Sequence, residues 1–236
     1  MTKKFTKTAS ALAPSRDAFI KTSALNELTS HFKYDLPPRA FEGITRILAE
    51  DCRKKEKKLP SDLKRSRRFL KKICRDFCSI DAARSGWKVI GPGIRRSYRA
   101  GRRACQLARA TGSPEDFHEW RKSAKDLLYQ VRFLGGIWPE QMKALEAELD
   151  RLGDCLGDAH DLTVLAGPET IKQMAGQPEE EIETLRALAG QRRKELQTKA
   201  LHMGTKLYDE KPASFCERLE CYWRRWRRKA RQVPVS

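Results

Sequence analysis

The chain has 236 residues, with 49 Lys and Arg against 31 Asp and Glu, which gives a formal net charge of +18. Hydrophobic residues make up 39% of the sequence, which suffices for a core and excludes a disordered basic tail or a disulfide-held miniprotein. No segment approaches the roughly 18 uninterrupted apolar residues of a membrane span, and the N-terminus lacks an apolar export signal. We therefore expect a cytoplasmic protein, without a membrane partner, that folds on its own.

Glycine and proline cluster between segments of helical length, and within these segments apolar residues recur at intervals of three and four. In chain order the predicted helices cover residues 17–30, 39–58, 61–79, 91–111, 114–135, 139–156, 158–175 with a break at Pro168, 179–209 and 212–229. Short connections imply antiparallel neighbours. The predicted fold class is all-α, an antiparallel helical bundle.

The two ends of the chain are expected to lie outside this bundle. Residues 1–16 are rich in Lys, Thr, Ser and Ala without a hydrophobic period, so we expect a flexible basic leader. Residues 17–229 form the predicted helical domain, and residues 230–236 form a short tail.

Seven cysteines argue against a disulfide framework or a zinc site, because their number is odd and no CxxC pair occurs. They are typical of small core side chains in a reducing compartment. His31 and His202 also lack partners at a zinc spacing, so we expect no metal and no cofactor. The positive excess is the stronger signal, since a chain that repels itself loses stability unless an anionic partner benefits from the field.

The predicted helix 114–135 places a polar row directly beside its apolar face. At about 100° per residue this row spans roughly 100°. Its members are His118, Arg121, Lys122, Lys125, Tyr129 and Arg132. A basic row is usually only a solvated face, and a lone histidine beside apolar residues can be a satisfied core residue. This row, however, is single-signed and adds a histidine and a tyrosine that can hydrogen-bond to an oxyanion, which favours an anion-binding groove between helices.

Other predicted helices repeat the pattern. The helix 91–111 carries basic residues at intervals of three and four, and the helix 179–209 carries them at an interval of seven. The residues concerned are Arg95, Arg99, Arg102 and Arg103 in the first, and Lys199 and Lys206 in the second. The helix 61–79 is also basic, over more of its circumference. Several helices could therefore present basic rows to one common surface.

Residues 117–127 read Phe-His-Glu-Trp-Arg-Lys-Ser-Ala-Lys-Asp-Leu. This resembles the His-x-x-Arg-Lys-x-x-Lys-x-Leu box of the CHAD family, the conserved histidine α-helical domain. Residues 93–104 resemble the family's Tyr-Arg-x-Gly-Arg segment, and residues 152–162 its Leu-Gly-x-x-x-Asp-Leu segment. Residues 204–212 resemble its Gly-x-x-Leu-Tyr-x-x-Lys-Pro segment. The four segments stand in family order over about half of the chain.

Similarity to this family implies two packed, pseudo-symmetric four-helix halves whose basic rows line a central groove. It also implies non-catalytic binding of inorganic polyphosphate, with association to polyphosphate granules and a triphosphate-processing enzyme as further expectations. Residues 17–111 would then be a divergent first half and residues 112–229 the second half with the His box. The family usually has another His box in its first half, but the nearest candidate, 63–72, has no histidine. Either this box is degenerate or part of the first half is missing.

The basic rows suit polyphosphate chemically. Polyphosphate offers only anionic oxygens to recognise. Suitable ligands are therefore the guanidinium of Arg, which can donate two hydrogen bonds to one phosphate, the ammonium charge of Lys and an N–H donor of His. One cation per helical turn repeats every 5.4 Å or so, comparable with two phosphate units of an extended chain. We therefore predict a polyphosphate groove lined by Arg95, Arg99, Arg102, Arg103, His118, Arg121, Lys122, Lys125, Tyr129, Arg132, Lys199 and Lys206.

Two other functions remain open. Nucleic acid is the second choice of partner, because the charge permits it although no DNA- or RNA-reading motif occurs. The aromatic and basic segment 223–229 could contact nucleic acid, but an amphipathic terminal helix explains it equally well. The other is an accessory or catalytic protein of polyphosphate or triphosphate metabolism. The Glu-x-Glu-x-Lys motif of triphosphate tunnel enzymes is absent. For His160-Asp161 we expect no catalysis, because the family resemblance points to the Asp, which would hydrogen-bond a neighbouring helix end or orient a groove arginine.

Overall fold

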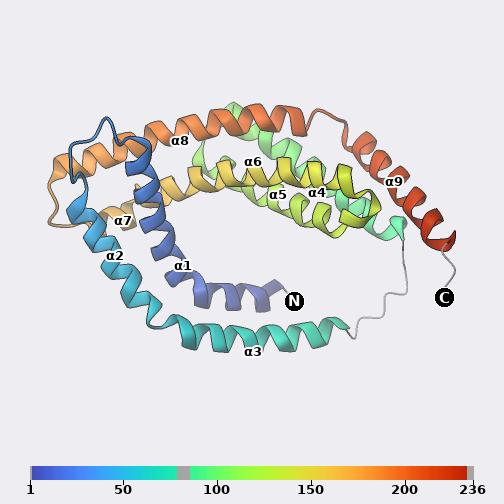
Figure 1. Cartoon of the computed structure of the whole chain (residues 1–236), viewed down its shortest axis with the longest axis horizontal. Coiled ribbons are helices and arrows are strands. Elements are labelled where there is room, and N and C mark those ends of the chain that lie inside the picture. Colours follow the sequence, from blue (N-terminus) through green and yellow to red (C-terminus); the bar gives the residue numbers. More distant parts are fainter. Residues whose placement is uncertain (1, 79–85, 233–236) are drawn as a thin grey trace. The chain divides into compact units, whose positions relative to one another are not determined.

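The computed structural model describes residues 2–78 and 86–232, and within these ranges it contains helices and no strand (Figure 1). The elements are α1 (Thr2–His31), α2 (Glu42–Glu56), α3 (Leu59–Cys78), α4 (Trp87–Thr111), α5 (Pro114–Phe133), the 3-10 helix η1 (Gly135–Ile137), α6 (Pro139–Leu165), α7 (Pro168–Gln173), α8 (Glu179–Leu207) and α9 (Pro212–Gln232). The predicted all-α class with antiparallel helix packing is confirmed.

The helix α1 begins earlier than the sequence suggested. Residues 2–16, predicted to be a flexible leader, continue α1 without a break, and Pro14 lies inside the helix. The Ser15 hydroxyl donates a hydrogen bond to the carbonyl of Lys55 in α2 at 3.2 Å. Helix extension here needs no apolar period, because Lys and Ala are good helix formers and the segment contains no glycine.

The long helix α6 merges two predicted segments. Gly157 was predicted to separate helices 139–156 and 158–175, but α6 runs through it to Leu165. An interior glycine costs about 1 kcal/mol relative to alanine and does not by itself end a helix. The predicted break at Pro168 is confirmed, since α7 begins there after Gly167. The predicted tail is helical as far as Gln232, and its last four residues lie outside the described ranges, as does residue 79 of the predicted helix 61–79.

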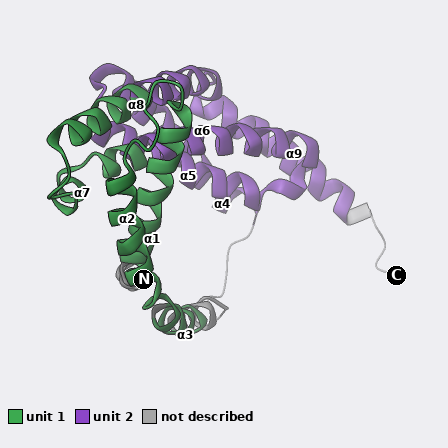
Figure 2. Ribbon diagram, turned by 60° about the vertical axis from the view of Figure 1, so that its left-hand side comes forward, with its two compact units in different colours: residues 1–82, 161–193 green, residues 83–160, 194–236 purple. Residues whose placement is uncertain are grey.

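The chain divides into two compact units (Figure 2). Unit 1 comprises residues 1–82 and 161–193, and unit 2 comprises residues 83–160 and 194–236. The boundaries fall inside α6 and α8, so each of these helices contributes to both units. The predicted halves, divided between residues 111 and 112, differ from these units, because that position lies within unit 2 between two helices that pack on each other.

In unit 1, α1 packs against α2 and α3. Its buried side chains include Leu25, Leu28, Phe41, Ile44, Leu48, Leu165, Met174 and Leu185. Lys21 is also buried, and its Nζ donates to Gln173 Oε1 at 3.0 Å. Burial lowers the pKa of this amine. The segment 63–72, the degenerate box candidate, belongs to α3, where Leu63 and Leu70 are exposed.

Unit 2 has a large aromatic core. Trp120 of α5 and Tyr98 of α4 are fully buried. The Tyr98 ring stacks on Phe215 of α9 with centroids 4.0 Å apart, and its hydroxyl donates to the carbonyl of Leu207 at 3.0 Å. Gly204 of α8 provides the space for Trp120, because a β-carbon there would overlap the indole ring. The core thus joins α4, α5, α8 and α9 of this unit.

Local signals fix the start of α5, which carries the predicted His box. Gly112 ends α4 in the left-handed conformation at φ 65°, which glycine adopts without strain. Ser113 caps α5, because its hydroxyl accepts a hydrogen bond from the backbone N–H of Asp116 at 3.1 Å. Pro114 follows at the first helical position. The residue at which α5 begins fixes the direction in which each of its side chains points, including those of the polar row.

Candidate anion-binding site

The first part of the polar row lies where α5 meets α6. The rings of His118 and His160 have centroids 4.6 Å apart and an interplanar angle of 34°. One turn further along α5, the Arg121 side chain passes over Gly157, where a β-carbon would lie 3.7 Å from Arg121 Nε. This distance is an ordinary van der Waals contact, so it shows that the Arg121 side chain lies close to the backbone of α6 at Gly157.

Two nitrogen atoms of this contact are buried and have no hydrogen-bond partner among the described residues. They are Nδ1 of His118 and Nε of Arg121. A guanidinium nitrogen can only donate, and a charged imidazole donates from both nitrogens. Buried donors are normally satisfied, so Arg121 Nε, and His118 Nδ1 when it carries a proton, are suited to an acceptor that the described residues do not supply.

The remaining members of the row differ in their surroundings. Lys122 is exposed and forms an ion pair with Glu119 one turn earlier, at 2.9 Å. Lys125 is half-buried, and the Tyr129 side chain is 59% exposed. His118, Arg121 and Lys125 are therefore the half-buried members of the row, whereas Lys122, Tyr129 and Arg132 are exposed.

Arg132, at the end of the row, is engaged by two carboxylates of α6. Its Nε donates to Glu146 at 2.8 Å, and its Nη2 donates to both oxygens of Asp150 at 2.8 Å. Hydrogen bonds to Glu146 and then Asp150 raise the pKa of the guanidinium. These carboxylates compensate the Arg132 charge, so this residue is a weaker anion ligand than its position in the row suggested.

The arginines of α4 line a different part of unit 2. A shallow groove of about 540 Å³ lies between α4 and α9, and Glu220 is the acidic residue in its lining. Its basic lining residues are Lys88, Arg95, Arg96 and Arg99. Cys216 of α9 donates from its thiol to the carbonyl of Gly91 at 3.4 Å in the same groove, and burial raises the pKa of this thiol.

The two rows point away from each other across the α4–α5 pair. A hydrogen bond of 2.8 Å from Gln130 to Ser97 marks the contact between these helices. Arg95 and Arg99 are each two residues from Ser97, which puts them on roughly the opposite side of α4. Arg121 is nine residues from Gln130, again about half a turn away on α5. The structure thus separates rows that the sequence had suggested might share one surface.

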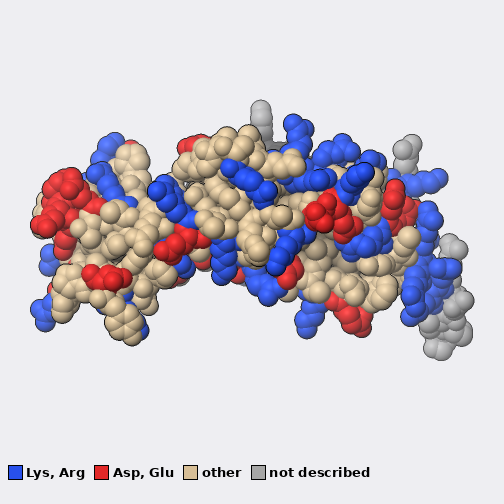
Figure 3. Space-filling model, turned by 90° about the horizontal axis from the view of Figure 1, so that it is seen from above, with Lys and Arg blue, Asp and Glu red and all other residues tan. Residues whose placement is uncertain are grey.

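The four remaining residues of the predicted groove lie on α4 and α8. On α4, Arg102 is half-buried and Arg103 is exposed. On α8, Lys199 and Lys206 are both exposed within the part of the helix that belongs to unit 2. On the face shown in Figure 3, Lys and Arg side chains gather toward the end of unit 2 where α9 lies. The basic character is therefore spread over several helices of this unit.

Three residues beside the predicted basic rows were not predicted from the sequence to belong to the site. His160 was set aside, although it follows Gly157 by three residues and therefore lies on the same face of α6. Lys88 and Arg96 were not assigned to the predicted groove, because no pattern along α4 shows that α9 covers one edge of its basic face. The i, i+3 spacing in α6 was a signal that could have found His160.

Membrane spans and metal clusters are the other features to consider in the described residues. No helix of the described chain carries a stretch long and apolar enough to cross a membrane. In residues 2–78 and 86–232, no group of three or more His, Cys, Asp or Glu side chains is arranged to hold a metal ion.

Comparison with known proteins gives one finding. The family model described as CHAD domain matches residues 1–167, more than two thirds of the chain. The match starts at residue 1 and so includes the segment predicted to be a leader, whereas the similar segment 204–212 lies beyond it. Searches of curated proteins and of solved structures found no significant match.

Proposed function

This chain belongs to the CHAD domain family, and on that premise we propose that unit 2 binds inorganic polyphosphate without transforming it. The binding surface is the α5 face that contacts α6, centred on His118, Arg121 and Lys125. The observation that carries this proposal is the pair of buried nitrogen atoms, His118 Nδ1 and Arg121 Nε, which have no hydrogen-bond partner in the described protein.

Phosphate oxygens satisfy both atoms at once. Nε of Arg121 has no hydrogen-bond partner among the described residues, so this donor is available to an anion. A hydrogen bond between a charged donor and a charged acceptor is roughly twice as strong as a neutral one. Lys125, one turn after Arg121 on the same helix, adds a point charge along the direction of a bound chain.

Exposed polar side chains extend this surface for longer chains. Lys122 and Tyr129 of α5 supply peripheral contacts, and Lys199 and Lys206 of α8 add positive charge elsewhere in unit 2. Arg132 contributes least because Glu146 and Asp150 hold it. Each contact with a phosphate releases condensed counterions, so the affinity falls as the salt concentration rises. A longer polymer meets more of these cations, and its avidity is correspondingly higher.

The α4 arginines form a second basic surface in this proposal. Arg95 and Arg99 in the α4–α9 groove, with Arg102 and Arg103 beside them, engage phosphate separately from the α5 face. A short chain occupies one of the two surfaces. The pseudo-symmetric four-helix halves with a central groove, which the family resemblance implies, remain part of the proposal.

The test is a binding titration with polyphosphates of graded length at two salt concentrations. We expect the affinity to increase with chain length and to decrease at the higher salt concentration. Duplex DNA and RNA, added at equal phosphate concentration, should displace polyphosphate poorly, because the central nitrogen atoms are buried and a wide, stiff duplex has less access to them than a flexible single chain. Equal displacement would favour a nucleic-acid-binding function, and release of orthophosphate in the presence of Mg²⁺ would show an enzyme.

A further inference from the structure

A second kind of cavity lies at the other end of α6 in unit 2. It has a volume of about 340 Å³ and is formed by the segment 136–140 and by three residues of α9. Those three residues are Arg225, Trp226 and Lys229. The opposite wall includes Trp138, so two indole rings and two cations line one small cavity.

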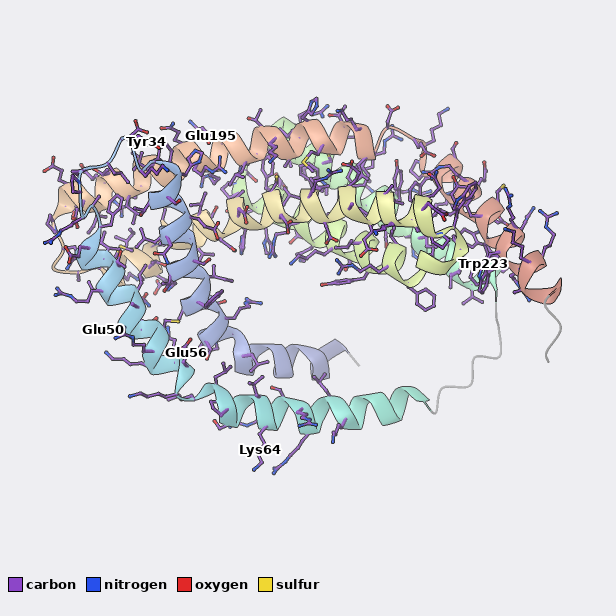
Figure 4. All side chains as sticks on the ribbon, viewed as in Figure 1. Tyr34, Glu50, Glu56, Lys64, Glu195 and Trp223 are labelled. Carbon is purple, nitrogen blue, oxygen red and sulfur yellow. The ribbon has the colours of Figure 1, made fainter. Side chains whose placement is uncertain are left out.

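Neighbouring aromatic rings hold both indoles. The Trp138 ring meets Tyr222 edge-on, with centroids 4.7 Å apart. The Trp226 ring lies 5.2 Å from Trp223, the α9 residue labelled in Figure 4, and Trp223 in turn lies 6.1 Å from Trp87 of α4. Trp226 nevertheless keeps 40% of its surface exposed. The cavity therefore offers an accessible aromatic surface that needs little rearrangement before a flat ring stacks on it.

The charges of the cavity are mostly positive. The Arg225 guanidinium lies 5.4 Å from the centroid of the Trp138 ring, a cation–π contact that orients it. Lys229 is exposed one turn further along α9, and Glu140 is the acidic residue of the lining. A group that carries negative charge is therefore favoured next to the aromatic surface.

We propose that this cavity binds a nucleotide, with the base against Trp226 and the phosphates at Arg225 and Lys229. Polyphosphate alone has no apolar surface with which to use two indole rings, and a neutral aromatic molecule would not use the two cations. A nucleobase stacks on aromatic side chains whatever its identity, because every base has a π-face. The volume suits one nucleotide better than a nucleic-acid strand.

The cavity is separate from the α5 face. Trp138 and Gly157 are 19 residues apart in the chain, and at 1.5 Å per residue this corresponds to roughly 28 Å along α6. A nucleoside triphosphate can also contact the α5 face through its phosphates alone. The base-dependent part of the affinity is therefore the quantity that reports on the cavity.

The experiment compares ATP with inorganic triphosphate by calorimetry on the full chain. Stacking of one base on an aromatic residue corresponds to roughly 5- to 150-fold in affinity, so ATP should bind at least about fivefold more tightly. Trp226→Ala should remove this difference and leave inorganic triphosphate and long-chain polyphosphate binding unchanged. Arg228→Ala, which removes a charge from α9 outside the cavity lining, should preserve the difference.

Equal affinities of the native protein for ATP and inorganic triphosphate would overturn the proposal, as would an unchanged difference in Trp226→Ala. Binding of a short single-stranded oligonucleotide without binding of AMP or ATP would also overturn it. If Trp226→Ala loses its helical circular dichroism signal, Lys229→Gln at an exposed position replaces it and should lower the affinity for ATP more than Arg228→Ala, which removes the same charge outside the cavity lining. Equal losses in these two variants would overturn the proposal. Failure of polyphosphate binding to the α5 face would leave these outcomes unaffected.

Discussion

Arg121 and Arg132 provide a matched pair of substitutions on one helix. Arg121→Ala and Arg132→Ala each remove one positive charge and one long side chain from the same row of α5. The two native environments differ, because Arg121 Nε is buried without a partner whereas Arg132 donates to Glu146 and Asp150. We expect Arg121→Ala to weaken polyphosphate binding strongly and Arg132→Ala to weaken it little.

The magnitude follows from the type of contact. A hydrogen bond that involves charged groups contributes about 1.5–3 kcal/mol, which corresponds to roughly 10- to 150-fold in affinity. Loss of one phosphate contact should also lower the slope of log affinity against log salt by about 0.7. In the native protein the charge of Arg132 is already compensated by Glu146 and Asp150. Arg132→Ala therefore removes no direct contact with phosphate and only weakens the long-range attraction of the polymer, which salt screens.

The assay is fluorescence anisotropy of end-labelled long-chain polyphosphate at several salt concentrations, with circular dichroism as the control for folding. The two variants share any general effect of a lower net charge. The ratio of their polyphosphate affinities therefore reports the local contact of Arg121 alone. Equal losses in both variants, or an unchanged affinity in Arg121→Ala, would refute the assignment of the α5–α6 contact as the binding surface.

Three further predictions concern the same unit. Gly204→Ala should lower the free energy of unfolding by about 1–3 kcal/mol in urea titrations, because the added methyl group overlaps Trp120, whereas Gly153→Ala has free space and should stabilise the helix by up to about 1 kcal/mol. Burial raises the pKa of Tyr98 to about 12 from the ordinary 10, so the unfolded state ionises first. The melting temperature should therefore fall between pH 10 and pH 12, and less so in Tyr98→Phe. His118→Ala should lower the polyphosphate affinity with little change in melting temperature, and the reverse result would make His118 a core residue.

Much of the fold was predictable because its signals are local. Ser113 and Pro114 start α5, and Gly112 ends α4, within a few residues of sequence. The apolar spacing in α5 identified the core face, and its members are buried. The exceptions were positions where two local preferences conflict. Gly157 disfavours a helix, but the residues on both sides favour one, and the continuous backbone hydrogen bonding of α6 prevails.

The candidate site was less predictable, because a helical wheel gives directions around one helix and not the identity of the neighbour in each direction. The Arg132 contacts join residues 14 and 18 positions apart, on a helix beyond the next turn of the chain. Likewise, α9 covers one edge of the basic face of α4 from more than 100 residues away. The polar row of α5 was predicted from its spacing, whereas its partners depend on tertiary packing.

The discontinuous composition of the two units has a consequence for biosynthesis. Each unit contains one segment from the first two thirds of the chain and one from the last third. When the ribosome has completed residue 160, unit 1 still lacks residues 161–193, and unit 2 lacks its α8 and α9 segments. The native contacts of Tyr98 form only after Leu207 and Phe215 have been synthesised, because its hydroxyl donates to the first and its ring stacks on the second. The buried core of each unit therefore closes only after its second segment has been synthesised, and until then the nascent chain exposes apolar surface that chaperones recognise.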